Sequence, residues 1–138
     1  MSTSVREYDP GDLDRCRELW SSLVQRHRES YDDPTLGSTD PGSEFDDYRK
    51  NPQLHRLWVA ESGGQLVGLC GLRVQDEESE LEPIVVDPKH RNLGIGAQLA
   101  KRAVSESRGL GVKYVNVRPV ARNVEAIRFF HREGFQLL

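Results

Sequence analysis

A glycine-containing turn between an apolar strand and a helix constrains this chain more than any other segment. Residues 81–86 end in Ile84-Val85-Val86, and residues 91–96 read Arg-Asn-Leu-Gly-Ile-Gly. Glycines at such a turn let the backbone approach a ligand, and the first N–H groups of the following helix lack an intrahelical partner. With the helix dipole, these groups favour an anion such as a pyrophosphate. The spacing matches neither the Walker nor the dinucleotide-binding pattern, so a tight structural turn is the open alternative.

The periodicity of the whole chain predicts a mixed α/β sheet with helices on both faces. Strand-like segments lie at about 4–8, 57–60, 66–74, 81–86 and 113–117. Helical spacing indicates helices at about 12–29, 44–50, 88–107 and, capped by Asn123 and ended by Gly134, at 124–133. Residues 61–65 are expected to form a hairpin loop, 76–79 a charged turn, and 135–138 the start of an extended segment. Gly68 and Gly71 indicate a bulge or a close backbone approach within a strand.

Length and composition exclude several protein classes. The 138 residues predict one domain, spanning 1–138 and large enough for a hydrophobic core. We find neither an apolar run long enough to cross a membrane nor a secretory signal. Cys16 and Cys70 are too few for a disulfide scaffold, so we expect reduced thiols and a cytoplasmic protein. No Cys/His spacing indicates zinc, and we expect no metal.

The charge is distributed unevenly along the chain. Residues 1–87 hold 19 acidic and 9 basic side chains, a net charge of −10, whereas residues 88–138 hold 3 acidic and 10 basic side chains, a net charge of +7. The imbalance indicates that the C-terminal part binds an anion, with Arg-rich helix surfaces as the alternative. Nucleic acid is a weaker candidate because the basic residues are scattered and no aromatic-interleaved strand pair accompanies them.

Three motifs in the expected order resemble one known family. The stretch 81–88, Leu-Glu-Pro-Ile-Val-Val-Asp-Pro, followed by Arg-x-x-Gly-x-Gly, resembles the central motif of the GNAT superfamily of acyl-CoA-dependent N-acetyltransferases. Asn123-x-x-Ala-x-x-x-Phe130-x-x-x-Gly-Phe is similar to that family's final helix. Residues 58–61 and 67–71 are similar to its early hairpin. The resemblance covers nearly the whole chain and implies a GNAT fold with a mixed, mostly antiparallel sheet.

The resemblance implies that acetyl-CoA is the cosubstrate. The backbone of Ile84 and Val86 would bind the pantetheine arm as a strand would, and the thioester would lie in the opening between this strand and the strand at 113–117. The loop at 91–97 would surround the pyrophosphate, and Asn123 would reach the pantetheine. The coenzyme-binding residues expected from the resemblance are Ile84, Val85, Val86, Arg91, Asn92, Leu93, Gly94, Ile95, Gly96, Ala97, Asn123 and Phe130.

The resemblance also implies direct acetyl transfer to a primary amine of a small molecule or peptide, and so a catalytic base. A primary amine with a pKa near 10 is almost wholly protonated at pH 7. A carboxylate can accept the proton that the amine must lose before or during its attack. Glu82 is the first candidate and Glu80, two residues earlier on the same strand face, is the second. Alternatively, both carboxylates are solvated, or they attract a cationic amine without acting as bases.

One position departs from the family pattern. The family often has a Tyr on the last helix that protonates the leaving thiolate, and here that position is Phe130, for which core packing is favoured. Tyr48 and Tyr114 are unplaced candidates for this acid. A thiolate with a pKa near 8.5 can leave without one. The departure supports a second hypothesis, a non-catalytic acyl-CoA-binding module, while a phosphate-binding structural domain is a third.

The acceptor side and the end of the sheet are less defined. In the family, the segment corresponding to residues 20–53 determines the acceptor. Its acidic residues weakly suggest a cationic amine, although solubility explains them better: Asp32, Asp33, Asp40, Asp46 and Asp47. Family members usually add two strands after the Gly-Phe, so we expect truncated C-terminal strands and an open edge beside residues 113–117. Either the sequence is a shortened one, or a neighbouring segment covers the edge, or, as our hypothesis, a second chain in a homodimer covers it.

Overall fold

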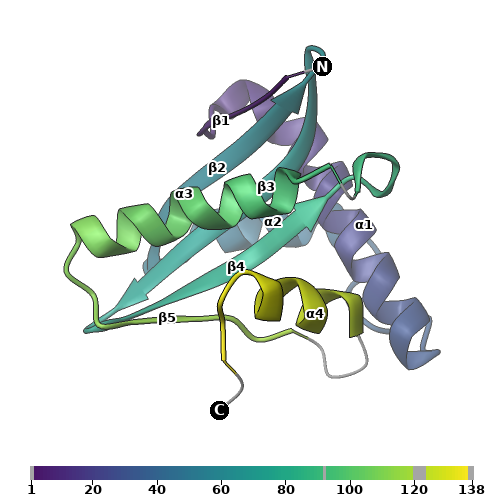
Figure 1. The fold of residues 1–138 in the computed structure, drawn as a ribbon. Helices are drawn as coiled ribbons and strands as arrows, with labels where there is room; N and C mark the ends of the chain where they lie inside the picture. The colour runs from purple at the N-terminus through teal and green to yellow at the C-terminus, as the bar shows by residue number, and fades with distance from the viewer. Residues whose placement is uncertain (1, 92, 120–123, 137–138) are drawn as a thin grey trace.

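The computed structural model describes residues 2–91, 93–119 and 124–136, and five strands within them form one sheet in the order β1-β2-β3-β4-β5 (Figure 1). Neighbours among the first four strands are antiparallel, and β5 runs parallel to β4. The strands are β1 Thr3–Glu7, β2 Leu54–Ser62, β3 Gln65–Gln75, β4 Glu78–Val86 and β5 Tyr114–Asn116. This arrangement confirms the mixed, mostly antiparallel sheet predicted from the sequence.

Helices cover both faces of the sheet (Figure 1). One face packs against α3, and the opposite face packs against α1 and α2. The last helix, α4, contributes Phe129 to the α3 side. The four helices are α1 Leu13–Tyr31, α2 Pro41–Arg49, α3 Ile95–Gly109 and α4 Val124–Arg132, with short 3₁₀ turns at Pro10–Asp12 and Pro88–His90.

Two layers of apolar side chains fill the space between the sheet and its helices. On the α3 side, Trp58 and Leu72 are buried with Leu99. On the α1–α2 side, Leu69 is buried with Leu19 and Phe45. Residues 57–60 of β2 and 66–72 of β3 are therefore buried on both faces of the sheet, which explains why apolar residues occupy successive positions there.

Several element boundaries differ from the sequence-based prediction. The second helix begins at Pro41 rather than Glu44, because proline is well suited to the first helical position. The predicted helix start near Pro88 is wrong, since a 3₁₀ turn and the glycine loop precede α3. The charged turn is also shorter than predicted, because β4 already begins at Glu78, and Phe135 and Gln136 form no strand.

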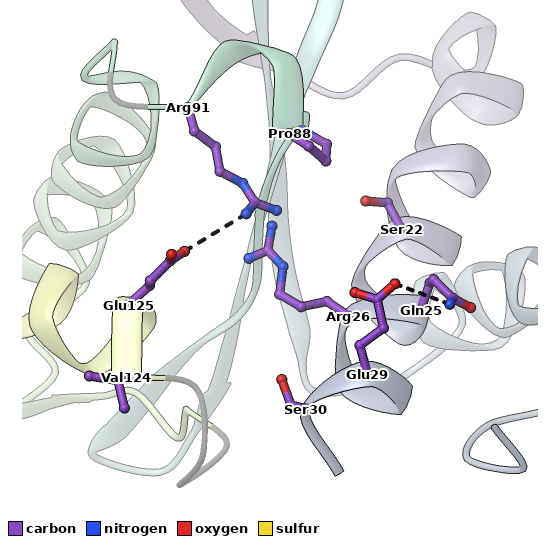
Figure 2. Close-up of a pocket in the computed structure, with 9 residues that line it drawn as sticks. All are labelled: Ser22, Gln25, Arg26, Glu29, Ser30, Pro88, Arg91, Val124 and Glu125. Carbon is purple, nitrogen blue, oxygen red and sulfur yellow. Dashed lines mark hydrogen bonds and ion pairs between the residues drawn. The ribbon is translucent and has the colours of Figure 1, made fainter. Parts of the chain in front are cut away.

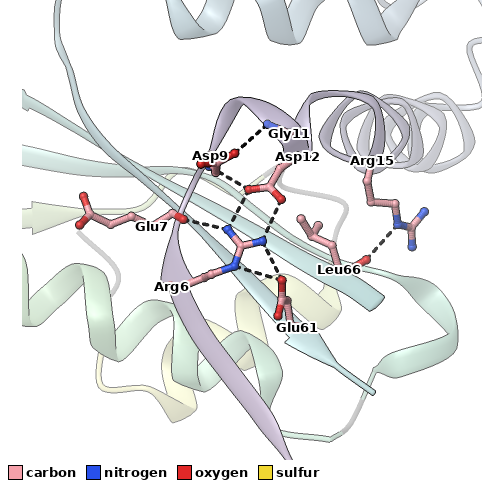
Figure 3. Close-up of polar contacts among 8 residues, drawn as sticks. All are labelled: Arg6, Glu7, Asp9, Gly11, Asp12, Arg15, Glu61 and Leu66. Atoms are coloured by element: carbon pink, nitrogen blue, oxygen red, sulfur yellow. Dashed lines mark hydrogen bonds and ion pairs between the residues drawn. The ribbon is translucent and has the colours of Figure 1, made fainter. Parts of the chain in front are cut away.

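A polar cluster joins the first strand to the beginning of α1 (Figure 3). The Arg6 guanidinium donates two hydrogen bonds to Asp12, at 2.9 and 2.8 Å, and also donates to Glu61 of β2. Asp12 in turn accepts from the backbone N–H of Asp9, which caps the 3₁₀ turn. The hydrogen bonds from Arg6 hold the pKa of Asp12 below its usual value. The cluster therefore fixes where α1 enters the fold.

Within the described residues, no helix combines the length and apolar character needed to cross a lipid bilayer. Both cysteines, Cys16 and Cys70, are free and buried. Burial raises the pKa of each thiol to about 12, so neither is a reactive thiolate.

Candidate active site

The strands β4 and β5 form a fork (Figure 1). They pair only between residues 78–80 and 114–116. Beyond this point β4 continues to Val86 with β3, but not β5, as its neighbour. The N–H of Asp87 donates to the carbonyl of Val67 at 2.8 Å, so Asp87 and Val85 direct their backbone groups toward β3. Because these directions alternate along a strand, the N–H and C=O of Ile84 and Val86 point into the fork. Two predicted pantetheine-binding residues thus present backbone groups to this opening.

A β-bulge in β4 marks the place where the fork begins. Cys70 pairs with Ile84 and Leu72 pairs with Leu81, so the single residue Gly71 lies opposite two residues, Glu82 and Pro83. A β-carbon on Gly71 would lie 2.7 Å from the Glu82 carbonyl oxygen, which explains the glycine. Residues 81 and 85 would share one face of a regular strand. The extra residue puts them on opposite faces, so Leu81 packs on the α3 side and Val85 packs on the α1–α2 side.

The predicted pyrophosphate loop follows β4 directly. Asp87 accepts a hydrogen bond from the N–H of Lys89 and forms an ion pair with Arg15. These two contacts fix the start of the loop. Leu93 is exposed, and Gly94 has φ +80°, a backbone conformation that favours glycine. Asn92 and Asn123, both predicted to bind coenzyme, lie outside the described residues.

The first turn of α3 offers free backbone donors. The first helical hydrogen bond runs from the N–H of Gln98 to the carbonyl of Gly94 at 3.1 Å, so the N–H groups of Ile95, Gly96 and Ala97 precede it. The Ile95 side chain is buried and anchors the turn. A β-carbon on Gly96 would lie 3.2 Å from the Phe129 ring, so this glycine also allows α4 to pack closely.

The two candidate bases lie beside the fork and share one cation. Arg73 Nη1 lies 3.1 Å from a Glu80 oxygen and 3.0 Å from a Glu82 oxygen. Arg118 contacts Glu80 alone, at 2.9 Å. The Glu80 side chain is 15% exposed and that of Glu82 is 52% exposed, so Glu82 is the carboxylate more open to a substrate. A cavity of about 140 Å³ adjoins Glu80 and Arg118.

Burial, followed by the neighbouring Glu82 carboxylate, raises the pKa of Glu80, even though Arg118 and Arg73 act in the opposite direction. A raised pKa favours the protonated form of this side chain. The pair therefore combines a partly buried, cation-flanked carboxylate with a more accessible one.

Three aromatic residues are relevant to the acid that would protonate the thiolate: Phe130, Tyr48 and Tyr114. Phe130 is buried and packs edge-on against Phe129 and Phe135, with ring centroids 5.2 and 5.6 Å apart. Tyr48 donates its hydroxyl hydrogen bond to the Glu82 carbonyl, and burial raises its pKa above the usual value. Tyr114 is 60% exposed on β5. Phe130 carries no transferable proton, and the Tyr48 hydroxyl is engaged with the bulge.

Two of the acidic residues in the segment that contains α1 and α2 are engaged in contacts with neighbouring side chains. Asp46 contacts both Arg17 and Arg49, and the hydrogen bond from Arg17 holds its pKa below the usual value. Asp33 accepts hydrogen bonds from Thr35 in a local turn. These contacts give two of the five carboxylates structural roles, which weakens the suggestion of a cationic acceptor.

A larger cavity of about 530 Å³ adjoins the loop, between the C-terminal half of α1 and the start of α4 (Figure 2). Arg91 enters it from the loop and Arg26 enters it from α1. Arg91 is among the coenzyme-binding residues predicted from the sequence, whereas Arg26 and Arg73 were not predicted. Arg73 pairs across the strands with Glu80, so a correct hairpin register would have identified it. Within the described residues, no group of three or more His, Cys, Asp or Glu side chains could hold a metal ion.

Comparison with known proteins agrees with this architecture. A sequence model described as the acetyltransferase (GNAT) family matches residues 16–135. A mycothiol acetyltransferase from Sanguibacter keddieii is 32% identical over 84 residues, which cover 56% of this chain and 27% of that protein. The chain's matches span between 27% and 57% of the length of three curated relatives.

Solved structures share the fold at low sequence identity. A GNAT-family acetyltransferase from Staphylococcus aureus superposes with a TM-score of 0.79 at 19% identity, covering 98% of this chain and 85% of the other. The PaiA N-acetyltransferase from Thermoplasma acidophilum, solved in complex with coenzyme A, superposes with a TM-score of 0.77 at 17% identity. That match covers 100% of this chain and 92% of the other.

Proposed function

The chain belongs to the acetyltransferase (GNAT) family, and from this premise we propose that it transfers an acetyl group from acetyl-CoA to a primary amine of a small molecule or peptide. The observation that carries the proposal is the fork: β4 leaves β5 after Glu80, directs the backbone of Ile84 and Val86 into the opening, and leads into a loop with free N–H groups. A solved structure of this fold holds coenzyme A, so the architecture can accept it.

Each part of the site would bind one part of the coenzyme. The backbone of Ile84 and Val86 would pair with the pantetheine amides as another strand would, whereas the backbone groups of Val85, also predicted to bind coenzyme, face β3. The N–H groups of residues 95–97 would bind the pyrophosphate, supported by the helix dipole. Asn92, Asn123 and Phe130 stay predicted contacts. The net charge of +7 on residues 88–138 supports this assignment, because the loop and α3 belong to that part of the chain.

In the proposed reaction the amine nitrogen attacks the thioester carbonyl carbon within a ternary complex. The new C–N bond forms as the C–S bond breaks, the amine proton passes to Glu82 directly or through water, and the thiolate takes a proton from solvent. Glu82 is preferred because it lies at the bulge and is the more accessible carboxylate. Glu80 is the second candidate, and its raised pKa would bring it closer to the range of a useful base.

A second candidate function is a non-catalytic module that binds acyl-CoA. The observation in its favour is the buried aromatic cluster around Phe130, at the position where the family often has a proton donor. Such a module would bind acetyl-CoA tightly and would not release free thiol in the presence of amines.

Incubation with acetyl-CoA and a panel of amines, followed by measurement of free thiol, tests the proposal. We expect thiol release that depends on one class of amine and falls strongly in the Glu82→Gln variant. Binding of acetyl-CoA by calorimetry without turnover on any amine would instead support the non-catalytic module. Absence of both binding and turnover would overturn both candidate functions.

Two further expectations accompany the proposal. Among the described residues β5 is one of the two edge strands of the sheet, and we propose that a second copy of the chain covers it. Light scattering that shows only a monomer at high concentration would contradict this. The free, buried thiols of Cys16 and Cys70 favour a cytoplasmic location, which fractionation of the native host would test.

A further inference from the structure

Two arginines from separate elements share the cavity beside the loop. Arg26 lies on α1 and Arg91 lies at the beginning of the loop, and both line the cavity of about 530 Å³. Figure 2 shows their guanidinium groups turned toward one another. Like charges brought into one partly enclosed space repel each other, and an anion placed between them removes this repulsion.

The positive charge of the cavity is only weakly compensated. Arg91 lies 3.9 Å from a Glu125 oxygen, and the Glu125 side chain is 84% exposed, so this pair is loose. Among the described residues Arg26 has no hydrogen bond or ion pair from its side chain. The other acidic residue of the cavity, Glu29, accepts a hydrogen bond from Gln25 at 3.4 Å. Two guanidinium groups therefore remain available for an oxyanion.

The position of the cavity identifies the anion. Pro88 and Arg91 both line it, and they lie between the fork and the first turn of α3. The candidate bases lie further back along β4, six or more residues before Pro88, so the cavity is at the level of the coenzyme phosphates rather than of the reacting amine. Guanidinium groups suit phosphate because they bind its oxygens bidentately.

We propose that Arg26 acts with Arg91 to bind a phosphate group of coenzyme A, so that α1 takes part in holding the coenzyme. The proposal rests on the proposed function, since it assumes that the chain binds coenzyme A. It adds a residue outside the loop motif and links coenzyme binding to α1, whose second half belongs to the expected acceptor segment at 20–53. The phosphate belongs either to the pyrophosphate or to the 3′-phosphate, which share this chemistry.

Calorimetric titrations with coenzyme A, 3′-dephospho-CoA and pantetheine test the proposal. The variants are Arg26→Gln and the matched control Arg128→Gln, which removes an equal charge from an exposed position on α4 that does not line the cavity. We expect Arg26→Gln to weaken coenzyme A binding roughly tenfold, the scale of one charge-assisted hydrogen bond, and to leave pantetheine binding unchanged. The control should bind coenzyme A within about twofold of the wild type.

The arms of the experiment separate the two phosphates and the possible failures. A loss that disappears with 3′-dephospho-CoA assigns Arg26 to the 3′-phosphate, and a loss that persists assigns it to the pyrophosphate. Unchanged coenzyme A affinity in Arg26→Gln, or an equal loss with pantetheine, would overturn the inference while the proposed function stands. A raised acceptor KM with unchanged coenzyme A affinity would also overturn it. A wild type that does not bind coenzyme A would overturn the proposed function and this inference together.

Discussion

Arg73 Nη1 lies 3.0 Å from the Glu82 carboxylate, so the first candidate base is already paired with a cation where it meets the fork. The same nitrogen contacts Glu80, whereas Arg118 contacts Glu80 alone. The two arginines therefore provide a natural comparison between the two carboxylates.

Replacement of Arg73 by Gln should reduce kcat/KM by about tenfold, because Glu82 loses the charge-assisted hydrogen bond that orients it. Arg118→Gln is the matched control and should change kcat/KM by less than about twofold. Both variants should raise the pKa of Glu80 further, since each arginine lowers it, and an NMR titration of that carboxyl can measure this. Equal kinetic effects of the two variants would indicate Glu80 rather than Glu82 as the base.

The Glu82→Gln variant should lose about 10²- to 10⁴-fold in kcat, the usual contribution of a general base. Its affinity for acetyl-CoA should stay unchanged, because the proposed site for the coenzyme phosphates lies beyond Val86. Glu80→Gln should have a smaller effect on kcat. Steady-state rates measured at saturating acetyl-CoA distinguish these outcomes, and a wild-type rate in Glu82→Gln would exclude this residue as the base.

Introduction of a carboxylate at Gly94 should abolish coenzyme A binding, because Gly94→Glu places a negative charge against the pyrophosphate. Gly111→Glu is the control: Gly111 has a similar φ of +74° and open space around its α-carbon, but it follows the opposite end of α3. Both variants carry the same strain of a left-handed residue, about 1 kcal/mol. Calorimetry should show a loss of more than tenfold for Gly94→Glu alone.

Gly68→Ala should destabilise the fold. The added β-carbon would lie 2.9 Å from the Leu99 side chain and 3.3 Å from Ala60 and Ile95, where α3 packs on the sheet. Overpacking of this kind typically costs about 1–3 kcal/mol. Gly109→Ala, at the end of α3 with nothing within 4 Å of the new atom, should leave the free energy of unfolding unchanged or raise it slightly. Urea unfolding measures both.

Asp12→Asn should lower the free energy of unfolding by about 1–2 kcal/mol at pH 7, the scale of a lost cap and a paired carboxylate. The hydrogen bonds from Arg6 hold the pKa of Asp12 below 3.8 in the folded protein. Its stabilising contribution is therefore fully present above the unfolded pKa and is lost as the pH falls through the folded pKa. Unfolding measured at pH 7 and pH 2 should show the difference between wild type and variant shrink; a difference independent of pH would contradict this account.

Local signals in the sequence predicted the loop, the hairpin of β2 and β3, and the helices on both faces, because apolar periodicity reports which side of an element is buried. Boundaries were less predictable: Pro41 begins α2 through its fixed φ, three residues before the apolar pattern becomes visible.

The parts of the site that escaped prediction depend on contacts between distant residues. Arg26 and Arg91 are 65 positions apart and meet only because α1 packs beside the end of β4. Arg73 reaches both glutamates only through the register of β3 and β4. Neither arrangement leaves a periodic trace along the chain. The role expected for Gly96 was also incomplete, because its small size allows Phe129 to pack there.

Because Glu82 and Pro83 together oppose the single residue Gly71, the side chains of β4 after this bulge lie on the faces opposite to those that regular alternation would give. In a regular strand, residues 81 and 85 would share a face, and the backbone groups of Val85, not those of Ile84 and Val86, would point into the fork. Glu80, which alternates with Leu81, lies on the side of the sheet opposite α3, and the inserted residue turns the later donors of Ile84 and Val86 toward the opening. Deletion of Pro83 would leave Glu82 alone opposite Gly71 and keep Ile84 opposite Cys70, so the side chains from Ile84 onward would stay on their present faces while the local bend beside the fork would be lost.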